Sequence, residues 1–284
     1  MVQNFKIAVI GSGTMGTGIA HTAAQSGFKT LLIDINKAQL DKALFTLDKN
    51  LDRQVNKEII SQSDKQKILN NISLGTNINS CKEMDLVIEA IPEKYDLKVL
   101  VFKDLDSICK KSTILASNTS SISISNLGNQ TKRPDKIIGM HFMNPVPIMK
   151  LIEVINTIHT SKETTQIIID ISKQMNKSPI ECNDYPGFVS NRILMPMINE
   201  AIFCLEQNVA TKEAIDEIMK LGMAHPMGPL KLADFIGLDI CLDIMEVLFI
   251  GFNDPKYRPC PLLKEMVSSG LLGKKSGKGF YNYD

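Results

Sequence analysis

A histidine and a glutamate interrupt an apolar stretch in the middle of the chain. The stretch is HFMNPVPIMKLIEVI, residues 141–155, and it contains His141, Asn144 and Glu153. Histidine titrates near neutral pH, so it can accept a proton in one direction of a reaction and return it in the other. A carboxylate beside one ring nitrogen fixes the tautomer and favours the protonated ring. These residues therefore indicate a site of proton transfer.

The segment NPVP predicts how the histidine and the glutamate meet. Apolar residues on both sides of it predict two short strands, and Asn144–Pro147 reverses the chain between them. His141 on one strand can then lie beside Glu153 on its neighbour. His21 and His159 have no comparable acidic neighbour, so we expect them to be ordinary core histidines.

A glycine motif near the N-terminus predicts a dinucleotide site. GSGTMG, residues 11–16, follows an apolar strand and opens a helix, and Asp34 ends the next strand. In this motif the first glycine allows the turn, the second lets a pyrophosphate approach, and the third lets the helix pack close to the sheet. The acid can accept hydrogen bonds from ribose hydroxyls and repels a 2′-phosphate. We therefore expect NAD to be held by Gly11, Gly13, Thr14, Met15, Gly16 and Asp34.

A serine-rich segment follows another buried strand. The segment is ASNTSSISI, residues 116–124, and such segments are often only loops or helix caps. In an open α/β sheet, however, ligands bind outside the carboxyl ends of the strands. Asn118 and Ser120 would then project into the same crevice as His141, which ends the next strand.

The elements that must position these residues alternate between strand and helix. FKIAVIGSG, TMGTGIAHTAAQSG and KTLLIDI predict a strand, a helix and a strand. Residues 37–72 predict a pair of helices, and residues 94–109 a further helix between the strands MDLVIEAI and TILAS. DKIIGMHF and KLIEVI predict two more strands. This order predicts a Rossmann-like, doubly wound, mostly parallel sheet.

The pattern becomes helical after ECNDYPG. We therefore expect an NAD-binding domain at residues 1–184 and an all-α domain at residues 185–284. Two apolar stretches of the second domain, RILMPMINEAIFCL and LDICLDIMEVLFI, carry few charges. These faces either form the core within the domain or include a subunit interface, because a helical domain of this size does not bury every such face alone.

Composition excludes several classes of protein. The 284 residues carry 32 basic and 31 acidic side chains, so nothing favours nucleic acid or an anionic membrane as a partner. LADFIGLDICLDIMEVLFI contains four acids and cannot be a membrane span, and the N-terminus lacks signal-peptide features. Six cysteines without metal-site spacing predict reduced thiols, no metal site and a cytoplasmic protein.

Several stretches of the chain, in order, resemble the L-3-hydroxyacyl-CoA dehydrogenases, most of all the short bacterial 3-hydroxybutyryl-CoA dehydrogenases. The stretches are IGSGTMGTGIA, DLVIEAIPE, SNTSSISI, GMHFMNPVPIMKLIEVI, PGFVSNR, HPMGPLKLADFIGLD and YRPCPLLKEMV with GKKSGKGFYNYD. The resemblance implies reversible hydride transfer between acetoacetyl-CoA with NADH and 3-hydroxybutyryl-CoA with NAD. It also implies a homodimer formed through the helical domain at residues 185–284. Met143 and Ala224 depart from residues frequent in the family and leave the acyl-chain preference open.

The resemblance also implies catalytic roles. His141 is the base for oxidation and the acid for reduction, and Glu153 orients it. Ser120 bonds the C3 oxygen of the substrate, and Asn191 of SNR lies across the cleft from the second domain. Asn144 completes the polar lining, toward both cofactor and substrate.

Further residues are implied to hold the two large ligands. Glu93, Lys98 and Asn118, together with Ser120, face the nicotinamide half of NAD. Lys57, in the helical pair, lies near the CoA moiety of an acyl-CoA substrate, although Lys49 could serve instead.

Three other functions share parts of this pattern. A Ser–His–Glu hydrolase needs a nucleophile elbow such as G-x-S-x-G, and none stands near Ser120. A non-catalytic NAD-binding protein has no use for an intact His141–Glu153 pair. A dehydrogenase of a small hydroxy acid without CoA keeps the chemistry and changes the substrate, so only an assay with both kinds of substrate separates it.

Overall fold

The computed structural model describes residues 5–283 of the chain. Its residues divide into two compact units, residues 1–184 and residues 185–284. Each unit has a hydrophobic core of its own. The two units are therefore described separately.

The first unit is built on one sheet of eight strands. Their order is β3-β2-β1-β4-β5-β6-β7-β8, and neighbours are parallel except for the antiparallel pair β6 and β7. The predicted doubly wound, mostly parallel sheet is confirmed. The strands are β1 Lys6–Ile10, β2 Lys29–Ile33, β3 Ile72–Gly75, β4 Leu86–Glu89, β5 Ile114–Ser117, β6 Ile137–Phe142, β7 Leu151–Asn156 and β8 Ser178–Asn183.

The prediction missed the two outermost strands, β3 and β8. β3, with the sequence ISLG, is only four residues long and has no buried residue. β8, with the sequence SPIECN, contains a proline and is also exposed or half-buried throughout. Edge strands of this kind lack the apolar run that identifies a central strand of a parallel sheet.

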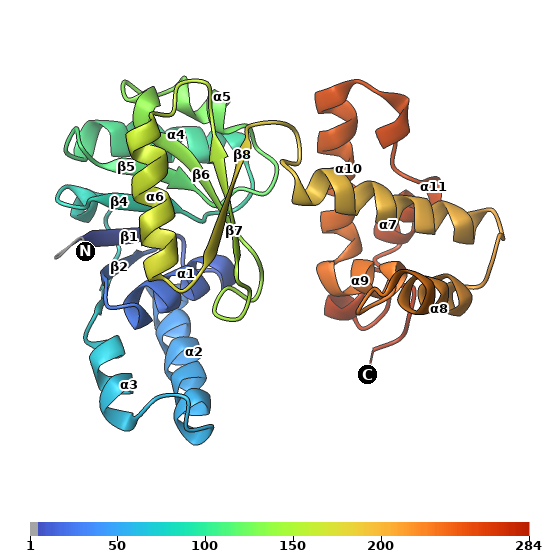
Figure 1. Cartoon of the computed structure of the whole chain (residues 1–284), viewed down its shortest axis with the longest axis horizontal. Coiled ribbons are helices and arrows are strands. Elements are labelled where there is room, and N and C mark those ends of the chain that lie inside the picture. The colour runs from blue at the N-terminus through green and yellow to red at the C-terminus, as the bar shows by residue number, and fades with distance from the viewer. Residues whose placement is uncertain (1–4, 284) are drawn as a thin grey trace. The chain divides into compact units, whose positions relative to one another are not determined.

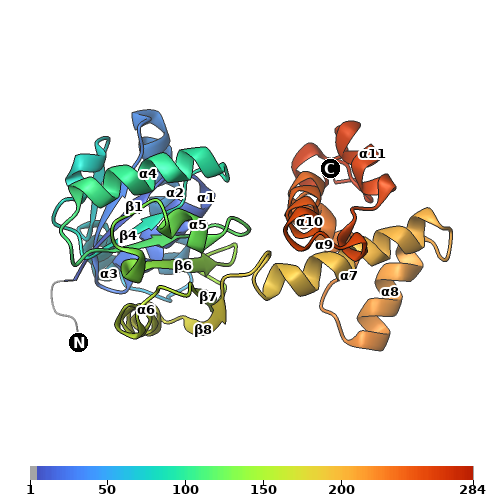
Figure 2. The same cartoon turned by 90° about the horizontal axis from the view of Figure 1, so that it is seen from above.

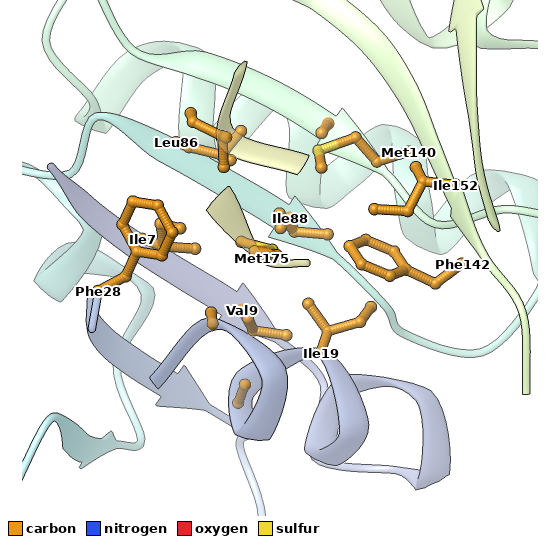
Figure 3. Packing of buried hydrophobic residues seen from close by; sticks show 14 of the residues in the cluster. Ile7, Val9, Ile19, Phe28, Leu86, Ile88, Met140, Phe142, Ile152 and Met175 are labelled. Atoms are coloured by element: carbon orange, nitrogen blue, oxygen red, sulfur yellow. The ribbon is translucent and has the colours of Figure 1, made fainter. Parts of the chain in front are cut away.

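Helices cover both faces of the sheet. Ile19 of α1 and Ile168 of α6 belong to one core cluster with Ile7 and Val9 of β1, so α1 and α6 pack on the same face. Figure 3 shows part of this cluster. Figure 2 shows α4 on the side of the sheet opposite to α6. The helices are α1 Thr14–Gln25, α2 Lys37–Asn56, α3 Gln62–Leu69, α4 Tyr95–Ile108, α5 Ile124–Gly128 and α6 Lys162–Gln174.

The predicted helical pair at residues 37–72 consists of α2 and α3, which Figure 1 shows projecting together from the sheet. Asn36 caps α2 with its side chain, and Ser61 and Asp64 form a capping box at the start of α3. Lys65 of α3 is buried and pairs with Asp48 and Asp52 of α2, at 2.7 and 2.6 Å. This ion pair network joins the two helices.

The second unit is helical, as predicted. Asp234 is buried and accepts hydrogen bonds from the N–H groups of Phe280 and Tyr281 and from the Tyr283 hydroxyl, which fastens the C-terminal segment to this unit. Within residues 5–283, no helix has the length and apolar character needed to cross a membrane. The helices are α7 Ser190–Glu206, α8 Lys212–Met223, α9 Pro229–Ile236, α10 Leu238–Phe252 and α11 Pro261–Ser268.

Two predictions about individual residue types have mixed outcomes. His21 is buried, as expected, but His159 is exposed, so its assignment to the core was wrong. His159 lies in the turn after β7, where its N–H donates to the Thr157 hydroxyl. All six cysteines are free thiols, but Cys182 and Cys204 are only half-buried.

Candidate active site

His141 and Glu153 face each other across the antiparallel pair of strands. β6 and β7 place the two residues directly opposite in register. His141 Nδ1 lies 2.8 Å from Glu153 Oε2, and the two residues are only 8% and 4% exposed. The predicted reversal therefore brings His141 and Glu153 together. Because Nδ1 faces Glu153, Nε2 lies on the opposite side of the ring.

The segment between these strands, residues 143–150, is called the proline loop below. It is anchored by Lys177, which is 7% exposed and donates hydrogen bonds from Nζ to the carbonyl oxygens of Val146 and of Met149, the latter at 2.8 Å. Burial lowers the pKa of Lys177, and the nearby Lys150 lowers it further. On the other side the loop packs on α1, where a Cβ at Gly18 would lie 2.9 Å from Val146 Cβ.

The segment after β5, residues 118–123, is called the serine loop. The Asn118 side chain accepts a hydrogen bond of 2.9 Å from the N–H of Phe142, which ties this loop to β6 beside His141. The carboxylate of Glu93 organises the loop. Its Oε1 accepts hydrogen bonds from the N–H groups of Ser120 and Ser121, at 3.0 and 3.2 Å, and from the Thr119 hydroxyl, and Ser120 Oγ lies 3.4 Å away. The structure thus brings Ser120, Asn118 and Glu93 together near the His141 strand.

Glu93 is in turn held by Lys98. Lys98 is 1% exposed, and its Nζ lies 3.2 Å from Glu93 Oε2 and 2.6 Å from Glu89 Oε1. Burial alone would raise the pKa of the Glu93 carboxyl, but Lys98 and the hydrogen bonds from Thr119 and Ser120 lower it below its ordinary value. Glu93 is therefore ionised. Lys98 lies buried between two carboxylates, and its predicted place at the cofactor stays a prediction.

The glycine motif forms the turn between β1 and α1. Gly11 has φ of +98°, and a Cβ at Gly16 would lie 1.8 Å from the Gly11 carbonyl oxygen, so both positions require glycine. A Cβ at Gly13 would meet nothing within 4 Å, and α1 begins at Gly13 without a side-chain cap. Open space at uncapped N–H groups fits an anionic pyrophosphate. These residues therefore fit NAD as the sequence predicted.

Asp34 follows β2 and is joined to the glycine motif. Its Oδ2 accepts hydrogen bonds of 2.8 Å from both the N–H and the hydroxyl of Ser12, and its Oδ1 accepts one of 3.0 Å from the N–H of Asn36. Burial opposes ionisation, but these hydrogen bonds from Asn36 and Ser12 lower the pKa of Asp34 below its ordinary value. Asp34 is thus a fixed anion at the carboxyl end of the sheet.

A pocket of about 330 Å³ begins at the glycine motif. It is enclosed by the first two turns of α1, by α2 and by the proline loop, including Asn144. On α2 a basic stripe continues from this pocket and consists of Lys42, Lys49, Arg53 and Lys57, which share one helix face because they are four or seven residues apart. In the part of the chain that the structure describes, none of the four pairs with a carboxylate.

Asn191 and possible metal ligands complete the description of the predicted residues. Asn191 lies in the first turn of α7, in the second unit, and is 8% exposed. Its catalytic role stays a prediction. Within residues 5–283, no three His, Cys, Asp or Glu side chains gather in a way that could hold a metal ion.

Sequence reasoning missed two residues of this region, Glu89 and Lys177. Glu89 ends the apolar strand β4, and Lys177 directly precedes β8. A glutamate in DLVIEA was the one available signal for the first, because charged residues are rarely placed in buried strands without a partner. Nothing in the sequence distinguishes Lys177 from a surface lysine.

Comparison with known proteins gives a consistent result over both units. The family model for the 3-hydroxyacyl-CoA dehydrogenase NAD binding domain matches residues 6–185, and the model for the C-terminal domain of the same family matches residues 187–283. The chain is 53% identical to the probable 3-hydroxybutyryl-CoA dehydrogenase of Bacillus subtilis, covering 98% of this chain and 97% of the relative. It is 52% identical to the 3-hydroxybutyryl-CoA dehydrogenase of Clostridioides difficile, covering 98% and 99%.

A solved structure agrees with these relatives. The crystal structure of (S)-3-hydroxybutyryl-CoA dehydrogenase from Ralstonia eutropha superposes with a TM-score of 0.96 and 49% sequence identity, covering 98% of this chain and 99% of that one. Fold and sequence similarity therefore extend over nearly the whole length of both proteins.

Proposed function

The chain belongs to the NAD-dependent 3-hydroxyacyl-CoA dehydrogenase family, and from that premise we propose that its substrate is the four-carbon thioester. The proposed reaction is reversible hydride transfer between acetoacetyl-CoA with NADH and (S)-3-hydroxybutyryl-CoA with NAD. The observation that carries the chemistry is the buried contact of 2.8 Å between His141 and Glu153, with the serine loop tied to the same strand. The relatives named above support the substrate.

The proton is handled by residues of the first unit. NAD, when bound, supplies the acceptor for the hydride that leaves C3 of the substrate, and NADH supplies its donor. In oxidation, His141 takes the proton of the C3 hydroxyl on Nε2, because Nδ1 already faces Glu153. The carboxylate holds the ring in one orientation and stabilises its charge while the proton is there. In reduction, the same proton returns to the C3 oxygen.

Ser120 and Asn144 provide the remaining polar contacts in this proposal. The Ser120 hydroxyl donates a hydrogen bond to the C3 oxygen, and Asn144 lines the site from the proline loop. Ser120 Oγ lies 3.4 Å from Glu93 Oε1, which is a long and weak hydrogen bond. Asn191 is proposed as a further substrate contact on the resemblance alone.

The adenosine half and pyrophosphate of NAD would be held by residues that follow β1 and β2, and the nicotinamide half by residues that follow β4 and β5. The N–H groups at the start of α1 bind the pyrophosphate, and Asp34 accepts hydrogen bonds from the adenosine ribose. Asn118 and Glu93 hold the nicotinamide half. Lys98 contributes through Glu93, because its ammonium is buried between Glu93 and Glu89.

The basic stripe of α2 supports a CoA thioester as the substrate. CoA carries several phosphate groups. Four cations that pair with no carboxylate of residues 5–283 lie along one face of this helix, next to the pocket at the glycine motif. The acids Asp48 and Asp52 point instead to Lys65 of α3. We assign Lys57 and Arg53, at the end of the stripe, to the phosphates. A small hydroxy acid without CoA would give these cations no partner.

We further propose that the protein is a cytoplasmic homodimer formed through the second unit. Exposed apolar side chains on α7, α8 and α10 support this: Ile193, Ile218, Leu221, Met223 and Ile250 are 59 to 82% exposed. Six free thiols favour a reducing compartment. Sedimentation analysis tests the dimer: Leu221→Asp and Ile250→Asp should each give a monomer, and an unchanged dimer would refute this interface.

The substrate proposal is tested by one comparison of substrates. Purified protein is supplied with NADH and either acetoacetyl-CoA or free acetoacetate, and the oxidation of NADH is followed. We expect turnover with the thioester and little with the acid. Equal turnover of both would show a dehydrogenase of small hydroxy acids. No turnover with either would leave only the binding of NAD and would overturn the proposal.

A further inference from the structure

Glu89 is a buried carboxylate that the proposed mechanism does not use. It ends β4, a strand in the middle of the sheet, and it is 0% exposed. An isolated carboxylate at such a position is very unfavourable unless hydrogen bonds and an opposite charge compensate it. The position of Glu89 at the carboxyl end of its strand places it where α/β sheets bind ligands.

Both oxygens of Glu89 have partners. Oε1 accepts hydrogen bonds from Lys98 Nζ at 2.6 Å and from the N–H of Ile91 at 2.7 Å, and Oε2 accepts one from the Ser117 hydroxyl at 2.6 Å. Ser117 is itself fully buried and ends β5, the neighbouring strand. Glu89 thus joins the ends of two strands and the start of α4.

Two routes lead from Glu89 to the serine loop. In the first, Lys98 bridges Glu89 to Glu93, whose Oε1 binds the N–H and lies near the hydroxyl of Ser120. In the second, Ser117 donates to Glu89 and accepts a hydrogen bond of 3.2 Å from the N–H of Thr119, the residue before Ser120. Glu89 therefore holds the serine loop by two routes, one through Lys98 and Glu93 and the other through Ser117.

The charges explain why a neutral residue would not serve. Lys98 faces two carboxylates, so its ammonium is shared between Glu89 at 2.6 Å and Glu93 at 3.2 Å. Without the charge on Glu89, the ammonium would be attracted to Glu93 alone. Glu93 would then be drawn toward Lys98 and away from the serine loop, because attraction between two buried full charges is stronger than the hydrogen bonds that Glu93 accepts from neutral N–H groups.

We propose that Glu89 is a positioning residue for the serine loop and sets the orientation of the Ser120 hydroxyl. This inference rests on the proposed role of Ser120 as the hydrogen-bond donor to the C3 oxygen. A merely structural role of Glu89 would lower stability and would lower activity independently of Ser120. Action through Ser120 makes the two substitutions depend on each other.

The test is a double-mutant cycle on kcat with Glu89→Gln and Ser120→Ala, at saturating acetoacetyl-CoA and NADH. We expect Glu89→Gln to lower kcat roughly tenfold or more, as for residues that orient a catalytic group. In the Ser120→Ala background the same substitution should change kcat by less than about threefold, since nothing remains to be oriented. An undiminished effect in that background would overturn the inference.

A control variant and a second route complete the experiment. Asp106 pairs with the buried Arg133 at 2.7 Å in the same unit and makes no hydrogen bond to the serine loop. Asp106→Asn should lower the melting temperature but leave kcat near that of the wild type. If Glu89→Gln does not fold, Ser117→Ala replaces it in the cycle. Full additivity of Ser117→Ala with Ser120→Ala would then reject the inference.

Failure of the proposed function gives a different result. If Ser120→Ala alone leaves kcat unchanged, Ser120 does not bond the reacting oxygen, and Glu89 has nothing to act through. If Ser120→Ala lowers kcat and the effects of the two substitutions multiply, the role of Ser120 stands and only that of Glu89 is wrong.

Discussion

The serine loop and the proline loop flank the same pair of strands, but ions of opposite charge hold them. The carboxylate of Glu93 collects N–H groups of the serine loop, and the ammonium of Lys177 donates to carbonyl oxygens of the proline loop. Two prolines, Pro145 and Pro147, have no N–H to offer, so an ammonium suits that loop better. The sign of a buried anchor thus follows from the backbone groups that its loop presents.

The two anchors also differ in how their charges are balanced. Glu93 has Lys98 and, beyond it, Glu89. Lys177 forms no ion pair with a carboxylate among residues 5–283, and burial lowers its pKa. His21 lines the pocket beside the same loop, and its pKa is lowered by burial and, to a smaller extent, by Lys177. Burial therefore disfavours the charged forms of Lys177 and His21 beside the proline loop.

Substitution of His141 should lower kcat more than any substitution that disturbs either loop. His141→Ala removes the proposed proton donor for reduction and should lower kcat by roughly 10²–10⁴, the usual contribution of general acid–base catalysis. NADH affinity, measured by fluorescence, should stay within a factor of two or so, since His141 is not part of the glycine motif. A smaller loss of kcat than that caused by a loop variant would mean that the proton comes from elsewhere.

Lys177→Met should separate the proline loop from the serine loop. The substitution leaves the carbonyls of Val146 and Met149 without their buried donor, and each such loss costs about 1–3 kcal/mol. We therefore expect the free energy of unfolding in urea to fall by roughly 2–4 kcal/mol and kcat to fall with it. Lys150→Met, at an exposed neighbouring lysine, is the control. Equal stability of the two variants would contradict the anchoring role.

Lys57→Ala should affect binding while leaving both loops intact. Lys57 is the C-cap residue of α2 and is exposed, so its contact with CoA would be remote from the reacting atoms. We expect KM for acetoacetyl-CoA to rise several-fold, about 3–10-fold, with little change in kcat, because a remote contact contributes uniform binding. Added salt should reduce the difference. Lys82→Ala, at an exposed lysine between β3 and β4, should change neither constant. A fall in kcat without a change in KM would remove Lys57 from the substrate site.

His21→Gln should change stability least at neutral pH. Its effect should appear as the pH falls, because His21 is a buried histidine beside the proline loop. Burial lowers the pKa of His21 from 6.5 to about 4. The unfolded chain therefore binds this proton first as the pH falls, so the folded state loses stability between pH 6.5 and about 4 and is unaffected above pH 6.5. By this linkage the wild type should lose up to about 3 kcal/mol relative to His21→Gln on going from pH 7 to pH 4. Parallel melting temperatures over that range would contradict it.

The sequence predicted those parts of the site that local patterns define. GSGTMG with Asp34 defines a strand, a turn and a helix, and HFMNPVPIMKLIEVI defines two strands and their reversal, so His141 and Glu153 could be paired in advance. The position of Ser120 after a buried strand placed it near His141, but its role came from the resemblance to a known family. That resemblance also supplied Asn191 and Lys57, which no spacing rule would have identified. The central strands were recognised by their apolar runs. The edge strands β3 and β8, which are not buried, were not.

The buried anchors could not be predicted, because burial of a charge depends on partners far away in the sequence. Lys177 reaches carbonyls about thirty residues earlier, and Glu89 reaches Ser117 on the next strand. The burial of Lys98 could not be predicted from the sequence either. Its position matched a cofactor residue of the family, but only the structure reveals that its ammonium is enclosed by Glu89 and Glu93.

The central claim is that Glu153 and His141 act as one unit in proton transfer to the C3 oxygen. The direct test is kcat for reduction of acetoacetyl-CoA as a function of pH, for the wild type and for Glu153→Gln, with NADH affinity measured in parallel. Glutamine keeps the shape and removes the charge that favours the protonated ring. We predict a lower kcat and an alkaline decline of activity at lower pH than in the wild type, with NADH affinity retained. An intact kcat with an unmoved alkaline decline would contradict the account.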